Sequence, residues 1–398
     1  FDGTPFTIFH FNDNKEEQDQ TSIEVRYSST FSDRFNFVVG VNQFQQNYSI
    51  GERRNFFIAL NSATYSETEH DTFGIFGEIN FNVTDALSLT AGGRWTKEEK
   101  SIDIGILGSC ELDFSSCTNN ASNEKDWSNF SPKVAAQYQF TDDMMAYASW
   151  TRGFASGVFN ARAATLDAVG PTDPESVDSI EVGFKTSFLD GRGIFNIAYF
   201  QADYEDLILF VNNPCDNCGA SLINFNAGEA EISGFEAEVQ FQPVEGLRLE
   251  ASVGTVDPEF TSIKYFDANA DGVVDSKDNA LARTWDFQKV AELSYNVAGT
   301  YTMNMAQGGS LMTRAAYSWR DDYMTDLYNK PWLQQKSFGL LDASLTYTSP
   351  NQSVRVSVYG KNLTDEEYFD YAADVGTLDS ARWGGAPRTY GVRVSYQY

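Results

Sequence analysis

The chain has 398 residues, with 28 Lys and Arg against 56 Asp and Glu, so its formal charge is −28 at neutral pH. This acidic balance argues against a nucleic-acid partner, because nucleic acids are bound through basic residues. Hydrophobic residues make up 42% of the chain and aromatic residues 15%, which excludes an intrinsically disordered protein. The apolar runs are well short of the roughly 20 residues that a membrane-spanning helix needs.

Apolar residues recur at every second position in many stretches, with polar or small residues between them. In residues 179–188, for example, Ile180, Val182 and Phe184 alternate with Glu181. A period of two is typical of strands that have one apolar and one polar face. It predicts about fifteen strands, in chain order at 21–30, 35–50, 68–83, 87–104, 127–140, 143–156, 176–190, 194–212, 222–243, 247–260, 284–303, 308–324, 336–349, 352–372 and 386–398.

The predicted links alternate between short turns and long polar segments. The short links include 32–34, 84–86, 141–143, 190–193 and 244–246, and the long links include 105–126, 157–175, 261–283 and 373–385. A soluble sandwich or propeller has no reason to place every short turn at one end, and its strands are usually only about 5–6 residues long. Bacterial outer-membrane barrels have long strands, short periplasmic turns and long extracellular loops. The sequence therefore predicts an all-β transmembrane antiparallel barrel with a polar lumen and aromatic girdles at residues such as Tyr27, Trp95 and Tyr396.

Several segments carry a resemblance to a known family. Residues 360–368 (GKNLTDEEY), then 385–396 (GAPRTYGVRVSY) and the terminal Tyr398, resemble the carboxyl end of TonB-dependent outer-membrane receptors. Residues 147–154 (YASWTRGF) and 174–183 (PESVDSIEVG) add to the resemblance, which covers the chain from about residue 21 to its end.

Membership of this family implies a barrel of about 22 strands filled by an N-terminal plug, with a TonB-binding segment further upstream. Because about fifteen strands are predicted and Phe1 is not an initiator Met, we expect about seven strands, the plug and the TonB-binding segment to precede this sequence. Residues 1–20 would then be an extracellular loop segment, and residues 21–398 the C-terminal portion of the barrel. The alternative counts residues 6–11 as a sixteenth strand of a closed, porin-like barrel.

Residues 267–278 match the spacing of a twelve-residue calcium loop. The predicted ligands are the side chains of Asp267, Asn269, Asp271, Asp275 and Asp278 and the backbone carbonyl of Val273. Gly272 supplies the sharp turn, and Asp278 replaces the Glu of an EF-hand, so the loop is similar to the dockerin type. We expect Ca²⁺ here as a structural ion that holds a long extracellular loop. The alternative is an acidic loop exposed to solvent.

The four cysteines form two close pairs, Cys110 with Cys117 and Cys215 with Cys218, each in a long polar link. This pattern suits an oxidising compartment and favours two local disulfides. A zinc site at the second pair would need another CxxC or a nearby His cluster, and the sequence has neither.

The sequence gives little support to an enzyme or to a redox or nucleotide cofactor. Histidine occurs only at positions 10 and 70, and GxSxG, HExxH and Walker motifs are absent. Aromatic residues of the long links are candidate ligand contacts, with packing between links as the alternative. These residues are Tyr323, Tyr328, Trp332, Tyr368, Tyr371 and Trp383.

Residues and resemblance together favour an outer-membrane TonB-dependent receptor that imports a scarce nutrient, such as a ferric siderophore or another metal complex. The expected partners are the lipid bilayer and lipopolysaccharide, the TonB complex through a region upstream of Phe1, and the nutrient. The alternative is a passive porin-like or structural barrel without energised transport. Ferric siderophore, haem, cobalamin and oligosaccharide all remain open as ligands.

Overall fold

The computed structural model describes residues 9–56, 60–105, 117, 120–161, 163, 165–212, 222–263, 275–374 and 380–398. Fifteen strands form one antiparallel sheet in which each strand pairs with its neighbours along the chain. They are β1 (Phe9–Ser28), β2 (Phe35–Phe56), β3 (Leu60–Asn82), β4 (Leu87–Gly105), β5 (Asn120–Thr141), β6 (Met144–Ala155), β7 (Glu175–Phe188), β8 (Gly193–Asn212), β9 (Leu222–Val244), β10 (Leu247–Ile263), β11 (Leu293–Asn304), β12 (Ser310–Arg320), β15 (Phe338–Thr348), β16 (Val354–Lys361) and β19 (Thr389–Tyr396).

Within the described residues, the links carry seven short elements. They are η2 (Leu166–Ala168), α1 (Ser276–Ala282), β13 (Tyr323–Met324), η3 (Pro331–Leu333), β14 (Gln334–Gln335), β17 (Phe369–Asp374) and β18 (Ser380–Gly384). The pairs β13–β14 and β17–β18 form small sheets of their own. In the described part of the chain, no helix is long and apolar enough to cross a membrane.

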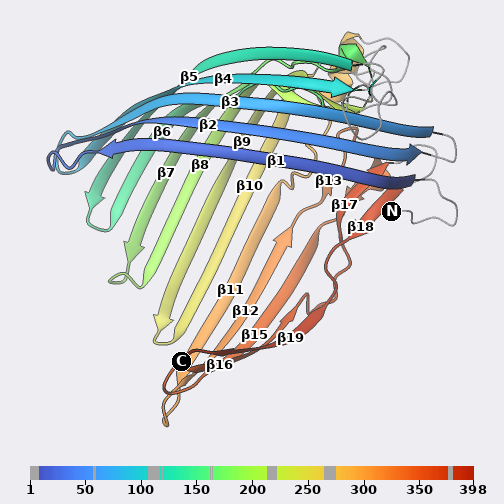
Figure 1. Ribbon diagram of the computed structural model, residues 1–398. Coiled ribbons are helices and arrows are strands. Elements are labelled where there is room, and N and C mark those ends of the chain that lie inside the picture. The colour runs from blue at the N-terminus through green and yellow to red at the C-terminus, as the bar shows by residue number, and fades with distance from the viewer. Residues whose placement is uncertain are drawn as a thin grey trace.

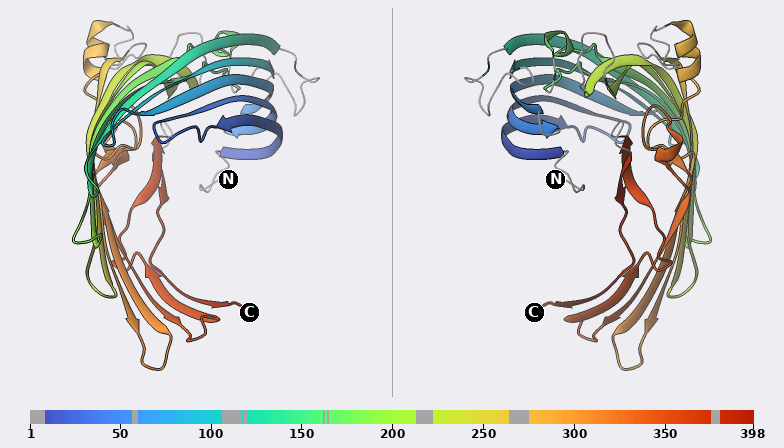
Figure 2. Two further views of the ribbon diagram at one scale, coloured as in Figure 1. Left: turned by 90° about the vertical axis from the view of Figure 1, so that its left-hand side faces the viewer. Right: turned by 90° about the vertical axis from the view of Figure 1, so that its right-hand side faces the viewer.

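The sheet curves into an open trough whose two edges are β1 and β19 (Figures 1 and 2). Short turns gather at one end and long links at the other (Figure 1). Some turns are very tight: Gly246, between β9 and β10, has a φ of 80°, which glycine adopts without a steric cost. The predicted antiparallel architecture of about fifteen strands is confirmed.

Several predicted boundaries are wrong, among them the starts of β5 at Asn120 instead of 127 and of β11 at Leu293 instead of 284. Residues 9–20, predicted as a loop, belong to β1, and no separate strand covers 9–11, as the sixteen-strand alternative required. The predicted link 51–67 is mostly strand, since β2 and β3 run to Phe56 and Leu60. The strand predicted at 352–372 ends at Lys361.

The lower wall, which is the part of the sheet near the short turns, has its apolar side chains on the outer face. Val25, Val41, Ile75, Trp95 and Phe130 form one outward row across β1–β5, each directly opposite the next. These side chains are substantially exposed, for example Val25 at 65% and Phe130 at 59%. An apolar outer face is what a wall in contact with lipid requires.

Toward the long links, the residues on the outer face of the sheet become polar. Two rows beyond Trp95, the outward positions of β2, β3 and β4 are Gln45, Asp71 and Glu99, again side by side. The strands therefore continue past the apolar belt as a hydrogen-bonded sheet that is polar on its outer face. We call this part, together with the long links, the rim. Apolar and polar residues do not alternate along the strands of the rim. The sequence pattern therefore did not reveal how far β1, β2 and β3 extend.

In the described part of the chain, the rim contains two clusters of buried apolar residues. The first rim cluster is Ile102, Ile104, Ala163, Ala168 and Val169, where link 156–174 covers the inner face of β4. The second rim cluster is Ala227, Ala230, Phe260, Ile263, Ala282 and Leu327, where α1 and the links after β10 and β12 pack on β9 and β10. The ring of Phe260 stacks on Phe287 with 4.0 Å between centroids.

Candidate functional site

A groove of about 740 Å³ crosses the inner face of the sheet from β6 to β15. One cross-strand row runs along it, with each residue opposite the next: Tyr147, Gly183, Ala198, Glu236, Gly254, Ser294, Arg320 and Phe338. Of the five positions from Gly183 to Ser294, all but Glu236 carry a small side chain or none, and this hollows the wall. The volume falls in the range of ligand pockets, which is about 300–1,000 Å³.

One end of the groove is set by Tyr147 on β6. Its ring lies across Gly183, where a Cβ would collide with it, and its hydroxyl donates a hydrogen bond of 2.5 Å to Glu181. The ammonium of Lys185 lies 5.5 Å from the centre of this ring, a cation–π distance. In the middle of the groove, Glu238 accepts a hydrogen bond from Asn196 at 2.5 Å.

The other end of the groove lies at the rim. Arg320 ends β12 and stands directly opposite Phe338, which begins β15. Tyr323, only 7% exposed, and Tyr368 complete this corner, and Asp370 of β17 lines it as well. Burial raises the pKa of the Tyr323 phenol, and the charge of Arg320 and its hydrogen bond to the phenol work in the opposite direction.

The structure brings two of the six predicted ligand-contact aromatics, Tyr323 and Tyr368, into this groove. Tyr328 instead packs edge-on against Trp285 at 5.6 Å, and Tyr371 lies under the ammonium of Lys289 at 4.6 Å. Trp332 is 51% exposed on η3, and Trp383 pairs through its backbone with Tyr371 on the hairpin β17–β18. A ligand role for any of the six stays a prediction.

Sequence reasoning missed four groups of this groove, namely Tyr147, Lys185, Arg320 and Phe338. Alternation places Lys185 on the polar face of its strand, but it does not say which residues of distant strands stand in one row. That information lies in the strand register, which follows from the turns and the pairing.

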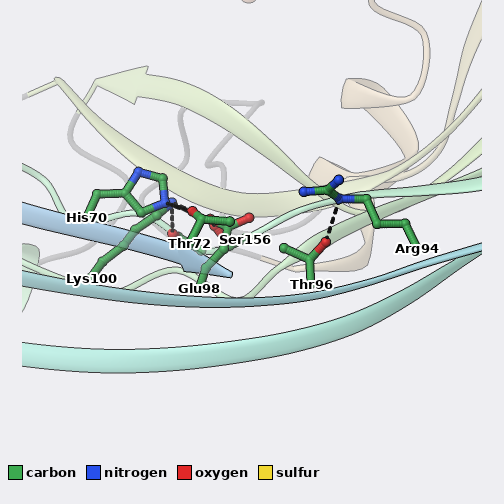
Figure 3. A network of polar contacts seen from close by, with 8 residues as sticks. His70, Thr72, Arg94, Thr96, Glu98, Lys100 and Ser156 are labelled. Carbon is green, nitrogen blue, oxygen red and sulfur yellow. Dashed lines mark hydrogen bonds and ion pairs between the residues drawn. The ribbon is translucent and has the colours of Figure 1, made fainter. Parts of the chain in front are cut away.

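A polar network at the rim fixes link 156–174 to β3 and β4 (Figure 3). Oε2 of Glu98 lies 3.0 Å from Nε2 of His70 and accepts a 2.6 Å hydrogen bond from Ser156. The ammonium of Lys100 is 3.6 Å from the same oxygen and donates hydrogen bonds to Ser156 at 2.6 Å and to the Gly157 carbonyl at 3.1 Å. The network thus joins two neighbouring strands to the start of the link.

Electrostatics stabilise the charged form of Glu98, which lies beyond the apolar belt on β4. The hydrogen bond from His70, with help from Ser156 and Lys100, lowers the pKa of Glu98 to about 2 despite its burial. Burial lowers the pKa of Lys100, which Glu98 partly opposes. Ser156 and His70 bind the same carboxylate oxygen rather than each other, so these three residues lack the serine-to-histidine contact of a catalytic triad.

The predicted calcium loop lies mainly outside the described residues, which resume at 275. Asp275 caps the helix α1, and Oδ2 of Asp278 accepts a 2.7 Å hydrogen bond from the Asp275 backbone. Asp278 is 1% exposed. Among the described residues, no group of three or more His, Cys, Asp or Glu is placed to hold a metal. Calcium binding stays a prediction.

Of the four cysteines, only Cys117 belongs to the described residues, and it is not a free thiol. Cys110, Cys215 and Cys218 lie outside them. The two pairings therefore stay predictions.

An antiparallel wall with an apolar outer face, a polar grooved inner face and long links at one end defines an outer-membrane β-barrel. The chain belongs to the TonB-dependent receptor family: the model for "TonB dependent receptor-like, beta-barrel" matches residues 2–363. This confirms the resemblance and the predicted localisation. The family consists of transport receptors rather than enzymes, which agrees with the sequence prediction.

Individual relatives are distant. The ferripyoverdine receptor of Pseudomonas aeruginosa is 23% identical over 331 residues, which cover 80% of this chain and 35% of that protein. The ferric-pyoverdine M114 receptor PbuA of Pseudomonas sp. is 22% identical, and the match covers 82% of this chain and 36% of that protein. This chain thus spans about a third of the length of these relatives.

Solved structures show the same fold. The ferric yersiniabactin uptake receptor FyuA from Yersinia pestis matches with a TM-score of 0.83 and 18% identity, over 99% of this chain and 56% of that one. The siderophore receptor PiuA from Acinetobacter baumannii matches with a TM-score of 0.76 and 16% identity, over 98% of this chain and 57% of that one.

Proposed function

We propose that this chain forms wall and rim of a receptor that takes up a metal complex, such as a ferric siderophore, across the bacterial outer membrane. The groove on the inner face carries this proposal, because it opens at the rim and combines aromatic rings with a few charged groups. The names of the relatives, which are receptors for ferric pyoverdines, support the same class of ligand. Transport would draw on the TonB complex, and the outer face would contact lipid and lipopolysaccharide.

Uptake by cells tests this function. The full-length receptor is expressed in a host strain that lacks its own copy, and entry of radiolabelled ferric siderophores is followed with and without a protonophore. We expect uptake of at least one complex that stops when the proton gradient collapses. Uptake that persists without the gradient, together with swelling of liposomes in small sugars, would instead establish the passive porin-like alternative.

We also propose that residues 267–278 bind a structural Ca²⁺. In support, α1 begins at Ser276, near the end of the twelve-residue loop, as the exit helix of a calcium loop does, and Asp278 is buried at position 12. The test is the thermal unfolding of the full-length receptor with calcium and with a chelator, for the wild type and for Asp271→Ala. We expect calcium to raise the Tm of the wild type only. An equal response in both proteins would contradict this site.

A further inference from the structure

At the rim end of the groove, one guanidinium lies near three aromatic rings. We infer that this corner, formed by Arg320, Tyr323, Phe338 and Tyr368, binds an anionic aryl group such as a catecholate or phenolate of the ligand. The inference rests on the proposed function and specifies the ligand class of the same groove.

Arg320 supplies the charge. Tyr323 lines the groove beside it, and among the described residues no ion pair joins Arg320 to a carboxylate. The side chain is exposed at the end of β12, where the inner face opens into the rim. A guanidinium presents donors in a planar fork, which suits two adjacent oxygens of one anionic group.

The aromatic rings are held in fixed positions. The ring of Tyr368 stacks on Phe338 at 4.6 Å with 11° between planes, and a Cβ on Gly385 would collide with it. The Tyr368 hydroxyl accepts a hydrogen bond of 3.2 Å from the Ala386 backbone. Rings that are already fixed bind a planar group without a further loss of side-chain entropy.

The charge at this corner favours an anion over a cation. Aromatic faces also attract cations, but here the guanidinium of Arg320 lines the same corner and already supplies a positive charge. Asp370 lines the same corner from β17, so an anionic group has to approach on the Arg320 side. The geometry therefore predicts oriented binding: aryl oxygens at Arg320 and the ring plane along Phe338 and Tyr368.

Two synthetic iron complexes test this inference on the purified full-length receptor in detergent. One is a tripodal ferric tris-catecholate, which is trianionic, and the other is a ferric tris-hydroxamate of the same arm length, which is neutral. Affinities are measured by quenching of tryptophan fluorescence. We expect the wild type to bind the catecholate more tightly. Arg320→Gln should weaken catecholate binding by about tenfold to a hundredfold, as for a lost charged hydrogen bond, and leave the hydroxamate unchanged.

Matched variants separate this site from the general charge of the rim. Arg382→Gln removes the same charge outside the groove, where Arg382 donates to the Trp332 carbonyl, and should bind both complexes as the wild type does. Arg320→Lys keeps the charge without the fork and should recover part of the affinity. An equal loss for both complexes in Arg320→Gln, or an equal loss in Arg382→Gln, overturns the inference. If the wild type binds only the hydroxamate, the inference fails and the receptor function stands. If it binds neither complex and no siderophore is taken up, both fail.

Discussion

The lower wall and the rim bury apolar side chains in opposite ways, although the same strands run through both. In the wall, Val25 and Phe130 point outward and stay exposed. In the rim, Phe260 and Ile104 are at most 1% exposed, beneath links that fold over the sheet. The wall thus depends on lipid to cover its apolar face, whereas the rim has cores like those of a water-soluble domain.

This difference changes what a substitution should do in each part. A methyl group removed from the outer wall leaves a space that fluid lipid chains can fill. Removing it from a rim cluster leaves a cavity between packed side chains. Substitutions in the two parts should therefore differ in the size of their effects.

The largest effect is expected for Phe260→Ala in the second rim cluster. The lost burial and the cavity should cost about 3–5 kcal/mol and loosen the contact of α1 and its link with β10. Hydrogen exchange of residues 247–263 measures this loosening. Val182→Ala on the outer wall, where Val182 is 49% exposed, is the control and should leave exchange unchanged. Equal protection in Phe260→Ala and wild type would show that the rim has no core of its own.

A charge on the outer wall should have the next largest effect. Val297 is 52% exposed on the outer face of β11, and Asn296 beside it faces the groove. Val297→Lys should cost up to about 2–4 kcal/mol, depending on its depth in the bilayer, because lipid solvates an ammonium poorly. The measurement is the fraction of receptor that assembles into the outer membrane in heat-modifiable form. If Asn296→Lys assembles as poorly as Val297→Lys, the assignment of faces is wrong.

The contrast between the two parts also explains what the sequence predicted. The wall was predictable because alternation such as Ile180, Glu181, Val182 reports directly which face meets lipid. Residues 9–20 were missed because Asn, Asp, Glu and Gln dominate both faces there. The groove and the network of Glu98 depend on register and on a link folding back, and neither leaves a local periodic signal.

The Glu98 network predicts a pH-dependent rim. Because the pKa of Glu98 is lowered to about 2, its contribution to stability is complete above about pH 4.5 and is lost as the pH falls toward 2. Each pKa unit corresponds to about 1.36 kcal/mol, so this contribution is on the order of 3 kcal/mol. Cleavage of link 156–174 by pepsin, followed from pH 4.5 to 2, should rise steeply in the wild type.

The variant Glu98→Gln sharpens this prediction. A neutral amide cannot be protonated in this range, and it binds His70 and Lys100 less strongly than the carboxylate does. The link should therefore be cleaved readily even at pH 4.5, with little further rise at lower pH. A wild-type pH profile in Glu98→Gln would assign the pH dependence to other carboxylates.

The smallest effect is expected one residue away, at Glu99. Glu98 and Glu99 are consecutive on β4 beyond the apolar belt, but Glu98 faces the link with a side chain only 16% exposed, whereas Glu99 points outward at 50% and pairs with Lys97. Water and salt screen an exposed pair of this kind, so it contributes little to stability. Glu99→Gln removes the same charge as Glu98→Gln and should leave the pepsin profile of the wild type unchanged. A profile altered as strongly as in Glu98→Gln would mean that the net charge of the rim, and not the buried inner network, holds link 156–174 in place.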